Sequence, residues 1–166
     1  MLAQVAGVVD LIITVGISHP DFSICNAAHA ALNSIAQCCP AVALHPPTAR
    51  AVVAHTNGAL TIFDTRLSYK LHTITAHTRG AGAVAFSPDG KLLATFCSAE
   101  RVVKIWHLVA TALFGLLSGG PRLFRSLVLS GEVFDTTASR LVWLPSGELS
   151  LHGCSGEKKV LAVDLP

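Results

Sequence analysis

Apolar residues in the first 39 positions recur at helical spacing. One set lies at intervals of one, three or four residues and comprises Leu2, Val5, Val8, Val9, Ile12 and Ile13. A second run, rich in alanine, covers residues 25–37. Asp21 or Ser23 is placed to cap this second helix, and Cys39 ends it because the residue before a proline is disfavoured in the helical region. The pattern predicts an α-helical hairpin over residues 1–39, the end of a helical region, whose nearly all-apolar helices pack on more than one side.

From residue 40 onward the apolar period becomes that of β-strands. Short apolar runs are separated by turn sequences, of which Asn57-Gly58 and Ser87-Pro88-Asp89-Gly90 are strong hairpin signals. The runs predicted as strands cover residues 42–44, 49–54, 60–63, 69–74, 83–86, 92–96, 102–106, 123–129, 141–144, 149–152 and 160–163. We expect the first four runs to form one sheet, the next three a second, and the last four a third. Residues 40–166 are therefore predicted to be mainly β.

The composition indicates that part of the protein surface is covered by other protein or by a membrane. The chain has 166 residues, of which 51% are hydrophobic and only 13% charged, so it can bury a sizeable core. A mean hydropathy of +0.56 indicates that part of its surface is covered by another part of a longer chain, a partner or a membrane. The net charge of +2, without a basic stripe, excludes an electrostatic nucleic-acid interface.

The sequence also indicates the cellular compartment of the protein and whether it binds a metal or cofactor. The apolar run over residues 2–17 is shorter than the ~20 residues of a membrane-spanning helix and contains Asp10, so it is not expected to cross a membrane. It also lacks the basic start of a signal peptide. Five cysteines without a CxxC pair favour reduced thiols and a cytoplasmic location. No Cys or His pair has zinc-ligand spacing, and we expect neither metal nor cofactor.

The segment from Ala76 to Trp106 carries the most specific motif. Two apolar runs are joined by Ser-Pro-Asp-Gly, and a third run ends in Trp106, which resembles one blade of a WD-repeat β-propeller. The resemblance implies a hydrogen-bonded network inside the blade, and the residues at its positions are His77, Thr95, Glu100 and Trp106. Glu100 is one methylene longer than the usual aspartate and one residue late, which leaves open whether the network closes. We expect a structural role for these side chains.

The predicted strands amount to about three blades. Propellers usually close with four to eight blades. We therefore expect an incomplete propeller preceded by the helical hairpin, either a piece of a longer protein or a unit that pairs with other blades. An open stack of three blades leaves two apolar faces exposed.

A series of short motifs runs along nearly the whole chain after the helices. They are residues 58–66, Ala76-His77, residues 86–95, Lys104-Ile105-Trp106, Leu113-Phe114-Gly115 and Arg140-Leu141-Val142-Trp143. This order resembles the C-terminal end of the rabconnectin-3 beta subunit family, large WD-repeat proteins with a helical region before their last blades. The resemblance implies a non-enzymatic scaffold that acts with the rabconnectin-3 alpha (DmX-like) subunit. It also implies a role in assembly of the vacuolar proton-pumping ATPase and acidification of endomembrane compartments, in the cytoplasm and on vesicle or endomembrane surfaces.

Two sets of residues are candidate partner contacts. Phe63-Asp64-Thr65-Arg66 resembles the aspartate-x-arginine box with which some WD-repeat proteins engage the adaptor of cullin-4 ubiquitin ligases, so a substrate receptor is the alternative function. Asp64 and Arg66 can equally end a strand and pair locally. The second set is Arg79 and Arg101, in predicted loops at the top of the blade, together with the exposed face of the N-terminal helices.

An enzymatic function is not expected from the sequence. Cys97 or Cys154 beside a histidine could form a nucleophile pair, but the segment Gly153-Cys154-Ser155-Gly156 does not have nucleophile-elbow spacing. The chain has no glycine-rich phosphate loop. Its glycines and serines lie where turns are expected, and we assign no catalytic residue.

Overall fold

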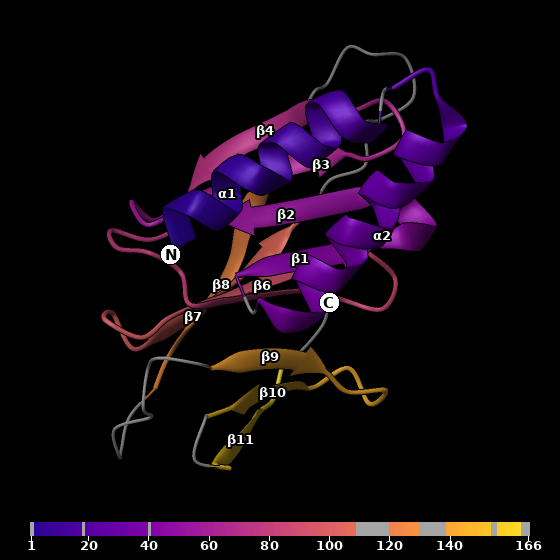
Figure 1. Cartoon of the computed structure of the whole chain (residues 1–166). Helices are drawn as coiled ribbons and strands as arrows, with labels where there is room; N and C mark the ends of the chain where they lie inside the picture. Colours follow the sequence, from indigo (N-terminus) through magenta and orange to yellow (C-terminus); the bar gives the residue numbers. More distant parts are fainter. Residues whose placement is uncertain are drawn as a thin grey trace.

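Two helices open the chain, in a computed structural model that describes residues 2–17, 19–39, 41–108, 120–129, 139–153 and 156–163 (Figure 1). Helix α1 (Leu2–Leu11) continues into the π-helical turn η1 (Ile12–Ile17), and α2 (Phe22–Cys38) runs back beside it. Asp21 caps α2, because its carboxylate accepts a hydrogen bond from the Ser23 backbone N–H at 2.8 Å. No helix among the described residues is long and apolar enough to cross a membrane.

The helices pack together and then onto the first sheet. A Cβ at Gly16 would lie 2.8 Å from the Ala28 Cβ, so the glycine allows η1 to approach α2 closely. Buried side chains of both helices share one core with strands of the first sheet: Ala6, Val9, Ile13, Ile17, Ala28, Leu32, Val42, Ala51, Val53 and Phe63. The opposite face of the helices exposes Leu11 and Phe22, at 61% and 77% of their surface. The helices are thus half-covered, with an apolar outer face.

Eleven described strands form three antiparallel sheets. The first has the order β1 (Val42–His45), β2 (Arg50–Ala54), β3 (Ala59–Asp64) and β4 (Tyr69–Thr75), with the 3-10 turn η2 (Pro46–Thr48) between β1 and β2. The second has the order β5 (Ala83–Phe86), β6 (Leu92–Cys97), β7 (Val102–His107) and β8 (Arg122–Val128). The third has the order β9 (Arg140–Trp143), β10 (Leu149–His152) and β11 (Lys158–Leu161).

One strand belongs to a different sheet from the one predicted. The sequence assigned residues 123–129 to the third sheet, but β8 pairs with β7, with Val102 opposite Val128. Pairing there covers the outer edge of β7 and adds Phe124 and Leu127 to the core that contains Val103 and Ile105. The prediction was wrong because it grouped strands by their distance along the chain, whereas the unpaired edge of β7 decides the partner.

The three sheets stack as successive blades with their first strands inward (Figure 1). β1 contacts β5, and β5 contacts β9. One apolar core joins the first and second sheets and includes Val52, Leu60, Phe86, Leu93 and Trp106. A second core joins the second and third sheets through residues of β5–β7 and β9–β11. The described residues are therefore mainly β, and the arrangement fits an incomplete propeller.

Candidate protein-interaction site

The second sheet brings together the four side chains that the sequence singled out. The Trp106 indole N–H donates to the Thr95 hydroxyl oxygen at 3.2 Å, and that hydroxyl lies 2.9 Å from His77 Nε2. On the other side of the ring, His77 Nδ1 lies 2.7 Å from Glu100 Oε2. The network left open by the longer, displaced acid is continuous in the structure. Glu100 stands one residue later than the usual aspartate, and its side chain is one methylene longer, which lets its carboxylate reach His77.

Burial and hydrogen bonding set the charges of this network. Burial is the main reason that the pKa of His77 lies below its ordinary value of 6.5, despite the opposing effect of Glu100. A neutral ring donates from Nδ1 to the carboxylate and accepts the Thr95 hydroxyl proton at Nε2. Burial alone would raise the pKa of Glu100, but hydrogen bonds from Thr78 and His77 outweigh it and lower that pKa to about 2. A neutral imidazole beside an ionised carboxylate is the consistent state at neutral pH.

The same carboxylate joins two loops at one end of the second sheet. Glu100, in the turn between β6 and β7, accepts from the backbone N–H and the hydroxyl of Thr78, in the loop between β4 and β5. Lys104 donates to the Ala76 carbonyl at 2.6 Å and so holds the start of that loop. The network fixes the shape of this end of the blade.

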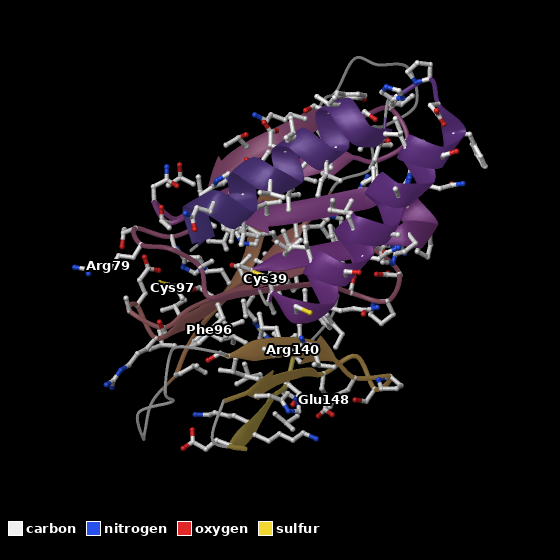
Figure 2. The ribbon with its side chains drawn as sticks, viewed as in Figure 1. Cys39, Arg79, Phe96, Cys97, Arg140 and Glu148 are labelled. Atoms are coloured by element: carbon white, nitrogen blue, oxygen red, sulfur yellow. The ribbon has the colours of Figure 1, made fainter. Side chains whose placement is uncertain are left out.

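Arg79 and Arg101 flank this junction. Each adjoins one of the joined residues, Thr78 or Glu100, and both arginines are exposed. Arg79 points outward at the rim (Figure 2). Arg101 has a φ of 53°, so its turn holds a left-handed conformation without glycine. The structure therefore brings two of the expected partner contacts to one rim.

Asp64 and Arg66 lie elsewhere. Asp64 ends β3 opposite Arg50 and Tyr69, at the end of the first sheet away from the Arg79 loop. Its Oδ1 accepts from the backbone N–H groups of Arg66 and Leu67 at 2.8 and 3.0 Å. Its Oδ2 lies 3.7 Å from the Arg66 guanidinium, and the Asp64 side chain is only 10% exposed. This geometry is that of a local turn cap.

Cys97 lies beside the network but is fully buried (Figure 2). His77, Cys97 and Glu100 each place one potential metal-ligand atom within 4.8 Å of the others, a grouping that sequence spacing did not reveal. Both ring nitrogens of His77 already have hydrogen-bond partners, so the ring is not available to a metal in this arrangement. Cys154 and Ser155 lie outside the described residues, as does the Leu113-Phe114-Gly115 motif.

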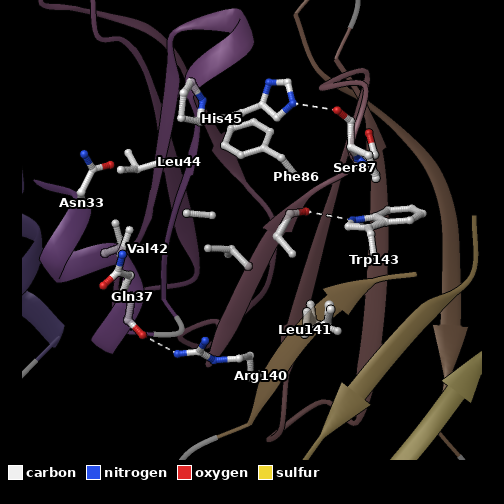
Figure 3. Close-up of a pocket in the computed structure, with 17 residues that line it drawn as sticks. Asn33, Gln37, Val42, Leu44, His45, Phe86, Ser87, Arg140, Leu141 and Trp143 are labelled. Atoms are coloured by element: carbon white, nitrogen blue, oxygen red, sulfur yellow. Dashed lines mark hydrogen bonds between the residues drawn. The ribbon is translucent and has the colours of Figure 1, made fainter. Parts of the chain in front are cut away.

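A groove of about 510 Å³ runs between the inner strands of all three sheets and helix α2 (Figure 3). Its walls come from α2, β1 with the start of η2, β5 with the following turn, and β9. Most of the lining is apolar, and the lining residues are Asn33, Ala36, Gln37, Val42, Ala43, Leu44, His45, Pro46, Val84, Ala85, Phe86, Ser87, Pro88, Arg140, Leu141, Val142 and Trp143. The groove forms where β1, β5 and β9, the first strands of the three sheets, lie next to one another.

Hydrogen bonds hold three of the groove side chains in place. His45 Nε2 lies 3.0 Å from the Pro88 carbonyl oxygen, which links the first and second sheets. The Trp143 indole N–H donates to the Ala85 carbonyl at 3.2 Å and links the third sheet to the second. The Arg140 guanidinium donates to the Gln37 carbonyl at the end of α2 (Figure 3). Arg140 is the one charged side chain among the described residues that line the groove.

Sequence patterns did not predict this groove. Arg140 and Trp143 appeared only as part of a short motif, and no role was predicted for His45. The available signal was the apolar first strand of each predicted sheet, but only the packing of the sheets shows that these strands converge.

Comparison with known proteins supports the repeat and the fold. Residues 68–107 match the family model described as WD domain, G-beta repeat, and this stretch contains the His77–Trp106 network. The β-propeller domain of Cps50 (Swd1) from Myceliophteria thermophila has a similar structure, with a TM-score of 0.50 and 12% sequence identity over 72% of this chain. The match covers 41% of that chain, so this chain spans less than half of it. The likeness shows that the described sheets have a propeller fold.

Proposed function

We propose that this WD-repeat chain is a non-enzymatic scaffold that binds a protein partner in the groove between β1, β5, β9 and α2. The observation that carries the proposal is the groove itself, whose walls come from three sheets and a helix. Most of its lining is apolar, and its side chains are held by bonds between the sheets. A preorganised apolar groove with a few fixed polar groups is the kind of surface that proteins use for binding.

The groove also indicates the chemistry of the partner segment. Trp143 and Arg140 belong to the residue types that contribute most to binding energy at interfaces. Arg140 has no acidic neighbour among the lining residues, so its charge favours a carboxylate on the partner. We infer that the segment is apolar with at least one acidic residue. The exposed Arg79 and Arg101 add positive charge at the rim of the second sheet.

The identity of the partner rests on the sequence resemblance alone. Similarity to the rabconnectin-3 beta subunit family supports the rabconnectin-3 alpha subunit as partner, and regulation of vacuolar proton-ATPase assembly at endomembrane surfaces as the role. The alternative, a receptor for a cullin-4 ligase, has less support because Asp64 is already bonded within its own turn. The propeller fold is compatible with both roles.

A charge reversal at Arg140 tests the groove. The 166-residue chain and its Arg140→Glu variant would be used to capture purified rabconnectin-3 alpha subunit, with Arg122→Glu as the matched control. Arg122 is an exposed arginine on β8, outside the groove. The proposal predicts that Arg140→Glu loses capture and Arg122→Glu retains it. Equal capture by all three proteins would refute binding in the groove.

A further inference from the structure

A second pocket lies between helix α1 and the first sheet. Its volume is about 320 Å³, at the lower end of the ~300–1,000 Å³ of small-molecule sites. No residue lines both this pocket and the groove. Its walls come from α1, the turn between β2 and β3, β3 and β4, and the lining residues are Ala6, Gly7, Asp10, His55, Thr56, Asn57, Thr61, Phe63 and Lys70.

Asp10 brings a carboxylate with unused hydrogen-bonding capacity to this pocket. It is the one charged side chain in positions 1–17. Its Oδ1 is shielded from solvent and accepts no hydrogen bond from the described residues. Lys70 Nζ lies 3.6 Å from that oxygen, which is too far for a hydrogen bond. Because a shielded carboxylate oxygen without a donor is unfavourable, a ligand that supplies a donor there is favoured.

Lys70 places a positive charge beside that carboxylate. The Lys70 and Asp10 side chains are 57% and 45% exposed, so water screens their attraction and the ion pair is weak. Neither charged group takes part in another ion pair or hydrogen bond with the described residues. A ligand can therefore bind to both charges without breaking a strong contact.

His55 adds a third polar group to the pocket. Its Nε2 lies 2.7 Å from the Thr61 hydroxyl oxygen, and its Nδ1 has no hydrogen-bond partner among the described residues. Burial is the main cause that lowers the pKa of His55, and the charge of Lys70 lowers it further, against the opposing effect of Asp10. The ring is therefore neutral at pH 7, and the charges of Asp10 and Lys70 balance each other.

The rest of the pocket offers apolar surface and open space. Ala6 and Phe63, which are 7% and 2% exposed, contribute carbon atoms to the lining. Gly7 follows Ala6 on α1, and a Cβ built on Gly7 meets no atom within 4 Å. Open space therefore adjoins the wall of the pocket at this glycine, where a hydrocarbon group of a ligand has room.

The paired charges select a ligand that carries both signs. A lone cation at Asp10 would be repelled by Lys70, and a lone anion at Lys70 would be repelled by Asp10. A molecule with an ammonium and a carboxylate on the same carbon can form charge-assisted hydrogen bonds to both side chains. The apolar part of the lining favours a hydrocarbon substituent. α-Amino acids combine these features in a molecule small enough for the pocket.

We propose that the pocket between α1 and the first sheet binds a free α-amino acid with an apolar side chain. The ammonium of the ligand donates to the Asp10 carboxylate, and Lys70 donates to the carboxylate of the ligand. The side chain of the ligand packs against Ala6 and Phe63. This site is additional to the protein-binding groove and does not depend on it.

Isothermal titration calorimetry of the 166-residue chain tests the ligand class with L-alanine, L-leucine and L-phenylalanine as probes. We expect at least one of them to bind with a Kd of about 1 mM or tighter. The N-acetyl derivative of that probe lacks the ammonium, and its amide derivative lacks the carboxylate. Each should bind at least about tenfold more weakly. Failure of all three probes, or equal binding of either derivative, would overturn the proposal.

Substitutions test the two charged contacts. Asp10→Asn removes the negative charge with little change in shape, and Lys70→Gln removes the positive charge. Each should weaken binding of the probe at least about tenfold. The matched controls are Glu157→Gln and Lys158→Gln, at exposed positions outside the pocket, and these should bind normally. Unchanged affinity in Asp10→Asn or Lys70→Gln would contradict the assigned contacts.

A third variant and a direct measurement locate the ligand. Gly7→Leu extends a side chain into the open space and should weaken binding several-fold, whereas Ala27→Leu, at an exposed position of α2 outside the pocket, should not. In NMR titrations of the unaltered chain, the backbone amide signals of residues 7, 10, 55 and 70 should shift. Shifts confined to the groove segments 42–46, 84–88 and 140–143 would place the amino acid in the groove and refute the second site.

Discussion

Thr95 is the central residue of the buried network, and replacing it by valine removes one oxygen with little change in shape. The Thr95 hydroxyl is fully buried and connects His77 Nε2 at 2.9 Å with the Trp106 indole N–H at 3.2 Å. In Thr95→Val both groups lose their partner inside the second sheet. Each unsatisfied buried polar group costs about 1–3 kcal/mol. We expect a loss of about 3 kcal/mol in the free energy of unfolding.

The assay is urea denaturation followed by circular dichroism, with thermal melting in parallel. For a chain of this length, a loss of about 3 kcal/mol corresponds to a fall in Tm of about 6–12 °C. The matched control is Thr73→Val, the same change at an exposed position of β4, which should shift stability by less than about 0.5 kcal/mol. Equal stability of Thr95→Val and the unaltered chain would refute the network as a source of stability.

Three other perturbations have defined outcomes. The free energy of unfolding, measured by urea titration, should fall as the pH drops below 6.5 and again below 4.5. The pKa values of His77 and Glu100 are lowered in the folded chain, so the unfolded chain binds protons first as the pH falls. A flat profile from pH 7 to 4 would contradict this. Arg79→Glu with Arg101→Glu should weaken capture of the alpha subunit several-fold at low salt without a change in Tm; a lower Tm would mean that the arginines hold the blade. Gly58→Ala should lower stability by about 3 kcal/mol or more in thermal melts. Gly58 has a φ of +84°, and a Cβ there would lie 2.0 Å from the His77 carbonyl oxygen, so an alanine would be strained and would clash. Near-native stability of the variant would contradict this.

Local signals in the sequence were sufficient for most elements. The strand of residues 83–86 has its predicted bounds because Ser87-Pro88-Asp89-Gly90 marks its end and apolar residues fill its length. The second helix begins after Asp21 because the carboxylate caps it, and it ends at the predicted proline boundary. Such features depend on residues that are neighbours along the chain, which is why a single sequence reveals them.

Features that depend on packing were not accessible in the same way. The placement of β8 depends on which edge lies unpaired after β7 has formed, and the sequence between the two strands carries no signal for that. The groove depends on how β1, β5 and β9 converge, although each of them is an ordinary apolar strand. The reach of Glu100 to His77 likewise depends on the shape of a turn, and residue counting alone left it undecided.

The most direct test of the scaffold function is hydrogen–deuterium exchange of the 166-residue chain, alone and with purified rabconnectin-3 alpha subunit. If the partner binds in the groove, it should slow exchange in the strand segments that line it, residues 42–46, 84–88 and 140–143, in the unaltered chain but not in Arg140→Glu. Slowed exchange confined to other surfaces, or no change at all, would contradict it.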